Sequence, residues 1–305
     1  MGAGHDHGHA TRNRTRLALA LCVAATVLAA EVVGALLTGS LTLLVDAAHV
    51  LTDSLGLVVA LVAATLVRRP PSSRRTWGWR RAEVLAAGVQ ATILLGIGAY
   101  ALFEGVSRLL DPPAVAPGGM LVVGLVGLVG NVVMIAVLSG GRGDDLSMRA
   151  AFLEVVGDAL GSVAVVVAAT VIALTGWQRA DAVAGLVVVG LIVPRALLVL
   201  RDAGAILLES VPAGLDLDRV REHLLGRPHV VGVHDLHAST VSTGLPTLTC
   251  HVVLEDECFT DGHCLEVLAE LQECVAGHHA VAIEHSTIQL ESAAVARAHS
   301  EHLHA

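Results

Sequence analysis

The sequence predicts a membrane all-α bundle of six transmembrane helices, followed by a smaller α+β domain. Of its 305 residues, 54% are hydrophobic and only 15% are charged, and the mean hydropathy is +0.71. This composition is too apolar for an ordinary soluble domain and is typical of a chain with several membrane spans. The long apolar runs also end near residue 208, beyond which polar and acidic residues become frequent. This change indicates a second, soluble domain.

Histidines gather at both ends of the chain, in HDHGH at residues 5–9 and in HSEHLH at 299–304. Short His-rich tails have a composition that gathers metal ions, although many such tails are simply disordered. The chain is therefore expected to have four parts: a His-rich N-terminal tail, a transmembrane domain, a soluble domain and a His-containing C-terminal tail, at residues 1–16, 17–208, 209–292 and 293–305.

Six apolar stretches are long enough to cross a bilayer, which takes about 20 helical residues each. The segments between them contain Gly, Pro and charged residues, as in DPPAVAPGG and SGGRGDD, and such residues interrupt helices. The expected spans are residues 17–38, 41–67, 82–108, 118–139, 149–175 and 180–201.

Arginine predicts the orientation of these spans, because basic residues accumulate in cytoplasmic loops. Three Arg precede the first span and six lie between the second and third, whereas the alternate loops contain almost no basic residues. Both termini and the soluble domain are therefore expected in the cytoplasm. No small-residue cleavage site follows a short apolar core near the N-terminus, so we expect the first span to be retained.

Charge and motifs exclude several functions. The net charge of −9, without a basic stripe, argues against a nucleic-acid partner. The sequence contains no GxxxxGK[ST] loop that would bind a nucleotide. No nucleophile-and-base pair or cofactor loop indicates an enzyme, and no prosthetic group is expected. The five cysteines form neither a disulfide framework nor a CxxC pair, so we expect reduced cytosolic thiols.

Two of the expected spans contain ionisable residues within apolar sequence. VDAAHVLTDSLGLVV carries His49 and Asp53, and AFLEVVGDALGSV carries Glu154 and Asp158. Each pair has i,i+4 spacing and therefore shares one helix face. Ionisable residues at such depth usually face a bundle interior or an aqueous cavity. Two such helices can bring four side chains to one tetrahedral divalent ion such as zinc. The alternative is a set of hydrogen bonds that stabilises the bundle.

Asp46 lies one turn before His49 on the same span. Two interpretations of this carboxylate stay open. It could orient the His49 imidazole, as residues behind metal ligands often do, or it could be a structural carboxylate whose hydrogen bonds are satisfied within the bundle.

The soluble domain shows alternating helix and strand patterns. LDLDRVREHLLG predicts a helix, VVGVHDLHASTVS and PTLTCHVVLED predict strands, TDGHCLEVLAELQECVAG predicts a second helix, and AVAIEHSTIQLE predicts a third strand. The resulting order, α-β-β-α-β, fits a small α+β sandwich.

Several stretches resemble signatures of the cation diffusion facilitator family of zinc transporters. They are SLTLLVDAAHVLTDSLGL, WGWRRAEVLAA, FLEVVGDALGSV, LLESVP, GVHDLHASTVSTGLPTLTCHVVLED and IEHSTIQLE. The resemblance covers nearly the whole chain in the expected order. It implies a homodimer with six spans per protomer, a ferredoxin-like cytoplasmic domain, and export of a divalent metal in exchange for protons. It also implies a transport site at His49, Asp53, Glu154 and Asp158.

The chain departs from this resemblance at Glu154, where a zinc exporter is expected to have histidine. A carboxylate is a harder ligand than an imidazole, so the site would contain one nitrogen and three carboxylate ligands. Such oxygen-rich sites suit manganese and other hard ions better than nitrogen-rich sites do, although zinc also binds carboxylates. Zn²⁺ is the expected cargo, and Mn²⁺, Co²⁺ or Fe²⁺ is the alternative.

The resemblance implies a second metal site in the soluble domain, at His234, His251 and His285, with His237 and Cys250 as adjacent candidates. Related domains often complete this site with an acid two residues after the last histidine, where this chain has Thr287. The alternative is that these are strand histidines hydrogen-bonded within the fold or at the dimer interface. A bound ion would serve as a regulator.

Together these features predict a proton-coupled antiporter that exports divalent cations by alternating access at an intramembrane site. Its expected partners are divalent metal ions, protons, membrane lipid and a second copy of the chain. We expect it in a bacterial plasma membrane. A membrane-anchored metal sensor without transport is the alternative from another class, and the paired ionisable residues on two spans argue against it.

Overall fold

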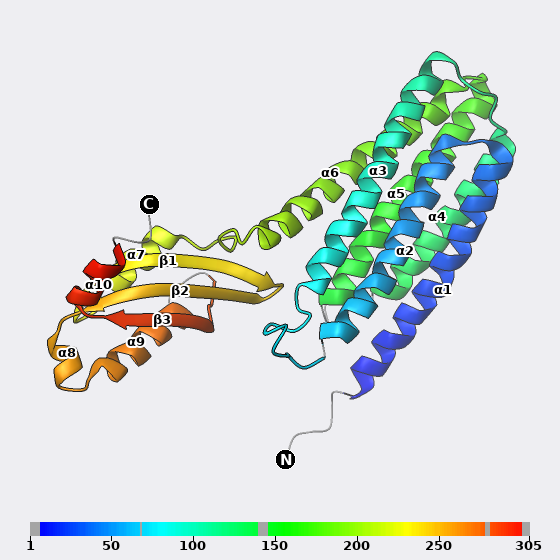
Figure 1. Cartoon of the computed structure of the whole chain (residues 1–305). Helices are drawn as coiled ribbons and strands as arrows, with labels where there is room; N and C mark the ends of the chain where they lie inside the picture. The colour runs from blue at the N-terminus through cyan, green and yellow to red at the C-terminus, as the bar shows by residue number, and fades with distance from the viewer. Residues whose placement is uncertain (1–6, 68, 140–145, 278–280, 301–305) are drawn as a thin grey trace. The chain divides into compact units, whose positions relative to one another are not determined.

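The computed structural model describes residues 7–67, 69–139, 146–277 and 281–300, which form a helical part and an α+β part (Figure 1). Of the two predicted His-rich tails, residues 1–6 and 301–305 lie outside the described residues, whereas residues 7–16 are helical and continue into the first expected span, and residues 293–300 form a short helix. Each of the six expected spans forms one helix. The helices are α1 (His7–Thr38), α2 (Leu41–Val67), α3 (Ala82–Leu110), α4 (Pro117–Ser139), α5 (Leu146–Thr175) and α6 (Arg179–Leu207).

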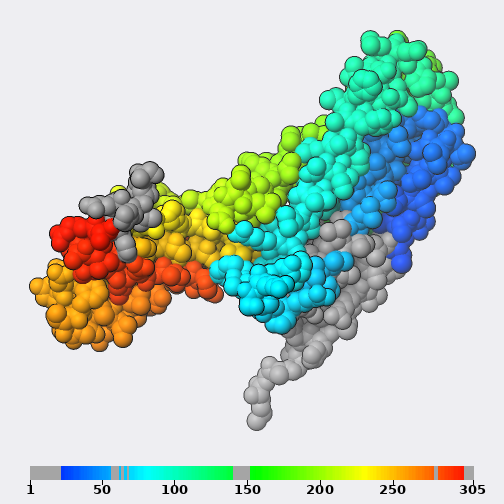
Figure 2. Space-filling view, in the orientation of Figure 1, coloured from blue at the N-terminus to red at the C-terminus, as the bar shows by residue number. Residues whose placement is uncertain are grey.

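Four of these helices are clear membrane spans by length and hydropathy within the described residues. They are α3, α4, the Phe152–Thr175 section of α5, and α6, while Cys22–Thr38 of α1 is a shorter apolar helix. The outer surface of α3, cyan to green in Figure 2, exposes large apolar side chains including Ile93, Leu102 and Phe103. Such a surface suits lipid, so the helical part is a membrane domain. That all six helices cross the bilayer stays a prediction.

Glycines end two of the helices, at the breaks that the sequence indicates. Gly39 follows α1 with φ +69°, and Gly176 follows α5 with φ +71°. Their N–H groups donate to the carbonyls of Ala35 and Ile172, at 2.9 and 2.8 Å. A left-handed residue after the last helical turn satisfies such carbonyls, and glycine adopts that conformation without steric cost.

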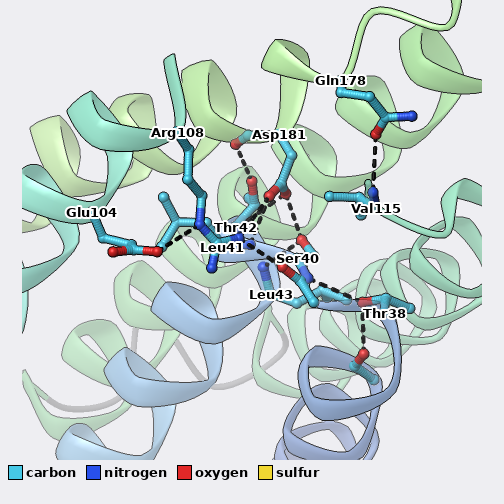
Figure 3. Close-up of polar contacts among 12 residues, drawn as sticks. Thr38, Ser40, Leu41, Thr42, Leu43, Glu104, Arg108, Val115, Gln178 and Asp181 are labelled. Carbon is cyan, nitrogen blue, oxygen red and sulfur yellow. Dashed lines mark hydrogen bonds and ion pairs between the residues drawn. The ribbon is translucent and has the colours of Figure 1, made fainter. Parts of the chain in front are cut away.

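The start of α2 is capped from another helix. The buried carboxylate of Asp181, in the first turn of α6, accepts from the Ser40 hydroxyl and from the N–H groups of Leu41 (2.6 Å) and Thr42 (3.2 Å) (Figure 3). The first N–H groups of a helix have no partner within the helix, and a negative charge there also interacts favourably with the helix dipole. Asp181 therefore ties α6 to α2.

Arg108, near the end of α3, joins the same network. Its Nη1 donates to the carbonyl of Gly39 at 2.7 Å and lies 3.9 Å from Asp181 Oδ2, and its Nε donates to Glu104 Oε1 at 2.9 Å. Three helix ends and the turn between α1 and α2 thus meet at one set of polar contacts.

Small residues let α1, α4 and α5 approach closely. A Cβ on Gly130 of α4 would lie 2.5 Å from Val27 Cγ2 of α1, and a Cβ on Gly124 would lie 2.7 Å from Val165 Cγ1 of α5. In membranes such small residues allow the packing that holds helices together. A Cβ on Gly127 would lie 2.9 Å from Ser162 Oγ and 3.2 Å from Glu31 Oε1. This glycine therefore also makes room for polar side chains inside the bundle.

The α+β domain contains a three-stranded sheet in the order β1-β2-β3, with β1 antiparallel to β2 and β2 parallel to β3. Its core includes Val220, Leu248, Val252 and Leu271. The elements are α7 (Leu217–Leu225), β1 (Val230–Ser242), β2 (Leu245–Leu254), α8 (Glu257–Thr260), α9 (Cys264–Gly277), β3 (His285–Glu291) and α10 (Ala293–Ser300).

The helix and sheet content agrees with the sequence prediction, and β1 has the predicted bounds. The third strand begins at His285 rather than at residue 280, and α8 and α10 were not predicted. Both unpredicted helices are short, and periodicity is a weak signal over so few residues. The ferredoxin-like fold stays a prediction.

Asp181→Asn should destabilise the helical part, because one of the carboxylate's two accepting oxygens becomes a donor facing donors. Leaving buried donors unsatisfied costs about 1–3 kcal/mol. Thermal unfolding of the purified protein in detergent should show a lower midpoint. Asp202→Asn is the matched control, since that carboxylate is exposed and pairs with the adjacent Arg201. Equal midpoints for the two variants would contradict the role given to Asp181.

Candidate functional site

His49 lies between two carboxylates in the interior of the helical part. Its Nδ1 is 3.5 Å from Asp53 Oδ2 on α2, and its Nε2 is 3.8 Å from Asp158 Oδ1 on α5. The three side chains are between 11% and 16% exposed. The i,i+4 spacing on α2 and the packing of α2 against α5 thus bring three of the four predicted ligands together.

Glu154, the fourth predicted ligand, lies on the same helix as Asp158, one turn earlier. Its carboxyl group interacts with that of Asp53 and with the charge of Asp158. All four predicted residues therefore belong to one polar cluster that joins α2 and α5.

Two neighbours of this cluster were not singled out from the sequence. Gln90 of α3 donates from Nε2 to Asp53 Oδ1 at 3.4 Å. Arg195 of α6 interacts electrostatically with His49, Asp53 and Asp158. An arginine inside an apolar helix, directly after Pro194, is itself a signal of function by the same reasoning that identified the acidic residues.

Several atoms of the cluster have no hydrogen-bond partner in the part of the chain that the structure describes. They are His49 Nδ1, Asp53 Oδ2 and Asp158 Oδ1. Buried polar groups are nearly always hydrogen-bonded, and each exception needs an explanation. Asp181 shows that this bundle can satisfy a buried carboxylate fully. The lone pairs of the cluster are instead free to bind a cation.

The separations fit a small divalent ion. A tetrahedral zinc ion holds nitrogen and oxygen ligands at about 2.0–2.2 Å, which places these ligand atoms about 3.4 Å apart. The separation of 3.5 Å between His49 Nδ1 and Asp53 Oδ2 is close to this value, and that of 3.8 Å between His49 Nε2 and Asp158 Oδ1 is slightly larger. An imidazole binds one ion through one nitrogen, so an ion shared by both aspartates requires His49 to rotate.

Asp46 packs against α5 one turn beyond Asp158, and the charges of these two carboxylates interact. Its Oδ1 lies against the backbone of Gly161 on α5, 2.4 Å from where a Cβ would be. Asp46 is 2% exposed and interacts with Glu31 of α1, which is equally buried. Among the described residues, no hydrogen bond or ion pair between Asp46 and His49 is found. These contacts favour the structural interpretation of Asp46 over an orienting contact with the imidazole.

A second cluster lies on the sheet of the α+β domain. His234 of β1 and His251 of β2 are directly opposite in the antiparallel register, with ring centroids 5.1 Å apart. The buried Glu291 of β3 bridges them. Its Oε2 lies 3.0 Å from His234 Nε2, and its Oε1 lies 2.7 Å from His251 Nδ1. One ligand atom from each residue lies within 4.8 Å of the others.

His285 does not lie in this cluster, and its role as a third metal ligand stays a prediction. It pairs with Thr247, at the start of β3, and its ring contacts Trp77 edge-on at 4.8 Å. His251 instead lies opposite Gln289, four residues further along β3, which is about 13 Å at the rise of a strand. Glu291 is on the same face of β3 as His285, but it lies at the other end of the strand, close to His251. In this structure Glu291, and not His285, lies beside the two strand histidines.

A bulge in β1 positions the next polar residues. The register shifts between His234 and His237, where Asp235 has φ +49°. Asp235 Oδ1 is 2.9 Å from His237 Nε2, and its Oδ2 is 3.6 Å from His251 Nε2. The hydrogen bond from His237 lowers the pKa of Asp235, so this carboxylate stays ionised beside His251. His237 therefore lies behind the cluster and pairs with Asp235.

Cys250 is not brought to the cluster. It neighbours His251 in β2, so its side chain points to the opposite face and packs in the hydrophobic core. Burial raises the pKa of its thiol to about 11. The Cys250 side chain therefore lies on the face of β2 opposite to the His251 ring and does not contribute to this cluster.

Comparisons with known proteins cover nearly the whole chain. Residues 17–208 match the cation efflux transmembrane domain family, and residues 212–293 match the cation efflux protein cytoplasmic domain family. The metal cation efflux system protein CzcD of Cupriavidus metallidurans is 39% identical over 293 residues, which cover 96% of this chain and 91% of that protein.

Two further relatives are similar over most of their length. The cadmium, cobalt and zinc/H(+)-K(+) antiporter of Bacillus subtilis is 35% identical, covering 87% of this chain and 84% of that protein. The zinc transporter ZitB of Escherichia coli is 37% identical, covering 88% and 84%. Among solved structures, the metal-bound C-terminal domain of the CzcD transporter is 36% identical and covers 25% of this chain and 99% of that chain, with a TM-score of 0.22.

Glu291→Gln should weaken zinc binding at the sheet cluster at least about tenfold, since even partners behind the direct ligands are worth 10- to 100-fold. His285→Gln is the control and should leave the affinity unchanged. Competition with a fluorescent zinc chelator can measure both, in full-length protein carrying Asp53→Asn and Asp158→Asn to remove binding within the bundle. A larger loss in the His285 variant would restore the residue trio expected from the sequence.

Proposed function

The chain belongs to the cation efflux family, and from that premise we propose that it is a proton-coupled antiporter that exports Zn²⁺ from the cytoplasm. The observation that carries this proposal is the pair of buried carboxylates on either side of His49, with lone pairs that no described protein group uses. The residues proposed to hold the transported ion are His49, Asp53, Glu154 and Asp158.

Proton coupling follows from the chemistry of these ligands. A metal ion binds the neutral imidazole and the ionised carboxylates, so protons compete with it for the same atoms. The imidazole ordinarily titrates near physiological pH, which suits it as a proton carrier. Carboxylates this close together share their protons, so a coupling pKa belongs to the whole cluster. Protonation on the outer side would release the ion, and the protonated site would return protons to the cytoplasm.

Alternating access at this cluster requires α2 and α5 to open to each side of the membrane in turn. Both helices contribute ligands, so a relative shift of the two changes ligand separations and access together. Arg195 adds a positive charge on α6 that partly offsets the three carboxylates when no cation is bound. We propose that this offset limits how tightly the site holds its cargo, which favours release.

The alternative cargo is Mn²⁺, Co²⁺ or Fe²⁺, because Glu154 makes the site rich in oxygen ligands. The names of the relatives favour zinc, cadmium and cobalt. The proposal also includes six spans, cytoplasmic termini, a homodimer and a bacterial plasma membrane. The homodimer is supported by the match of residues 212–293 to a cytoplasmic domain family of cation efflux proteins.

Purified protein in liposomes with an acidic interior should accumulate zinc, and dissipating the pH gradient should abolish the uptake. Asp53→Asn removes a charged ligand, so uptake should fall to that of protein-free liposomes. Asp202→Asn, at an exposed carboxylate outside the site, is the matched control and should transport normally. Glu154→His replaces a hard ligand with a softer one and should raise the preference for zinc over manganese.

Other outcomes have distinct meanings. Transport of manganese or cobalt in preference to zinc, reversed by Glu154→His, would assign the alternative cargo. Zinc uptake that does not depend on the pH gradient would contradict proton coupling but not zinc transport. An absence of flux for every ion tested, with zinc still bound by the α+β domain, would favour a membrane-anchored sensor.

A further inference from the structure

A third group of metal-ligating side chains lies at the end of the α+β domain where β1 begins and β2 ends (Figure 1). It consists of His229 directly before β1, Cys258 in α8 and His263 directly before α9. One ligand atom from each lies within 4.8 Å of the others. The pairing of Val230 with Leu254 brings the three segments together.

This group is separate from the cluster of His234, His251 and Glu291. His229 precedes His234 by five residues on an extended segment, which is about 16 Å at the rise of a strand. The two groups share no residue, so each would hold its own ion.

Both imidazoles are held by carboxylates on one side of the ring. His229 Nδ1 is 2.8 Å from Glu255 Oε2, and His263 Nδ1 lies 3.0–3.1 Å from the two carboxylate oxygens of Asp261. A carboxylate that accepts the Nδ1 proton leaves Nε2 deprotonated and fixes the ring orientation. Zinc sites in proteins are built with this carboxylate–histidine arrangement. The rings meet edge to face, with centroids 4.8 Å apart.

The backbone at His229 is strained in a way that supports the site. Its φ is +65°, a left-handed conformation that is unfavourable for a residue with a Cβ. Its carbonyl accepts the N–H of Glu255 at 3.0 Å, so the strained residue is fastened to the segment that also holds its ring. Strain of this kind persists where a particular side-chain position is needed.

Cys258 supplies the soft ligand. Its side chain is fully buried and packs within the core of the domain. The alternative interpretation is that Cys258 only fills that core. Two oriented imidazoles beside the sulfur are not needed for packing. They form a ligand set of two nitrogens and one sulfur, which selects zinc over magnesium, calcium or manganese.

We propose that His229, Cys258 and His263 form a Zn²⁺ site that fastens α8 and the start of α9 to the edge of the sheet. Three protein ligands leave a fourth position for water or for Glu255. Four acidic residues between 255 and 261 add negative charge around the ion. The site does not depend on the transport proposed above, because it lies in the α+β domain and uses none of the intramembrane residues.

Cobalt can test this site in full-length protein, because a thiolate bound to Co²⁺ gives a charge-transfer absorption that nitrogen and oxygen ligands do not. The wild-type protein loaded with Co²⁺ should show this band, and zinc should remove it. Cys258→Ser and His263→Gln should each abolish the band and reduce bound zinc by one ion per chain. Cys264→Ser is the matched control, at a free cysteine outside the cluster, and should keep both signals.

His229→Gln is a further variant that should fold normally, because the His229 side chain is exposed and its replacement leaves the core unchanged. It should weaken cobalt binding in the charge-transfer signal at least about tenfold, as expected for a lost ligand. A cobalt-loaded wild-type protein without the band, or a band that survives Cys258→Ser, would overturn the site. Neither result would bear on transport, which is measured separately in liposomes.

Discussion

The cost of burying ionisable groups in an apolar bundle is the constraint on which the rest of this structure depends. An unpaired polar group away from water costs several kcal/mol, so each must be satisfied or serve a purpose. Asp181 is satisfied by the first N–H groups of α2 and by Ser40. Asp53 and Asp158 keep buried oxygen atoms without partners among the described residues. The Asp181 carboxylate thus stabilises the fold, whereas Asp53 and Asp158 keep oxygen atoms that are able to bind a cation.

Close packing of the helices determines where the buried carboxylates lie. Gly127 of α4 and Gly161 of α5 have no side chain, and the carboxylates of Glu31 and Asp46 occupy the space where a Cβ would lie. The helices can therefore pack closely around these two carboxylates. The i,i+4 pairs on α2 and α5 then face each other across one contact. Since α2 and α5 provide both the packing and the proposed ligands, a relative shift of these helices would change the ligand separations. The proposed alternating access requires this coupling.

In the α+β domain, strand register decides which ligands meet. The antiparallel pairing of β1 and β2 places His234 opposite His251, and the parallel β3 brings Glu291 beside them. Where β1 begins and β2 ends, the pairing of Val230 with Leu254 also brings His229 close to Cys258 and His263. Two metal-ligating groups therefore lie along one sheet, at separate positions. A metal ion bound at either group would contact only the α+β domain and none of the residues of the intramembrane cluster.

The sequence by itself determined the positions of the six long apolar helices, the presence of both helices and strands in the second domain, and the family. It also determined the pairing of His49 with Asp53 and of Glu154 with Asp158, because hydrophobic runs and i,i+4 spacing are local properties of the chain. Only the tertiary structure decided that Glu291 and not His285 faces the strand histidines, that Asp181 caps α2, and that Cys258 lies beside two imidazoles. Each of these depends on register, a bulge or a contact between distant segments, and no local periodicity specifies which distant residues will meet.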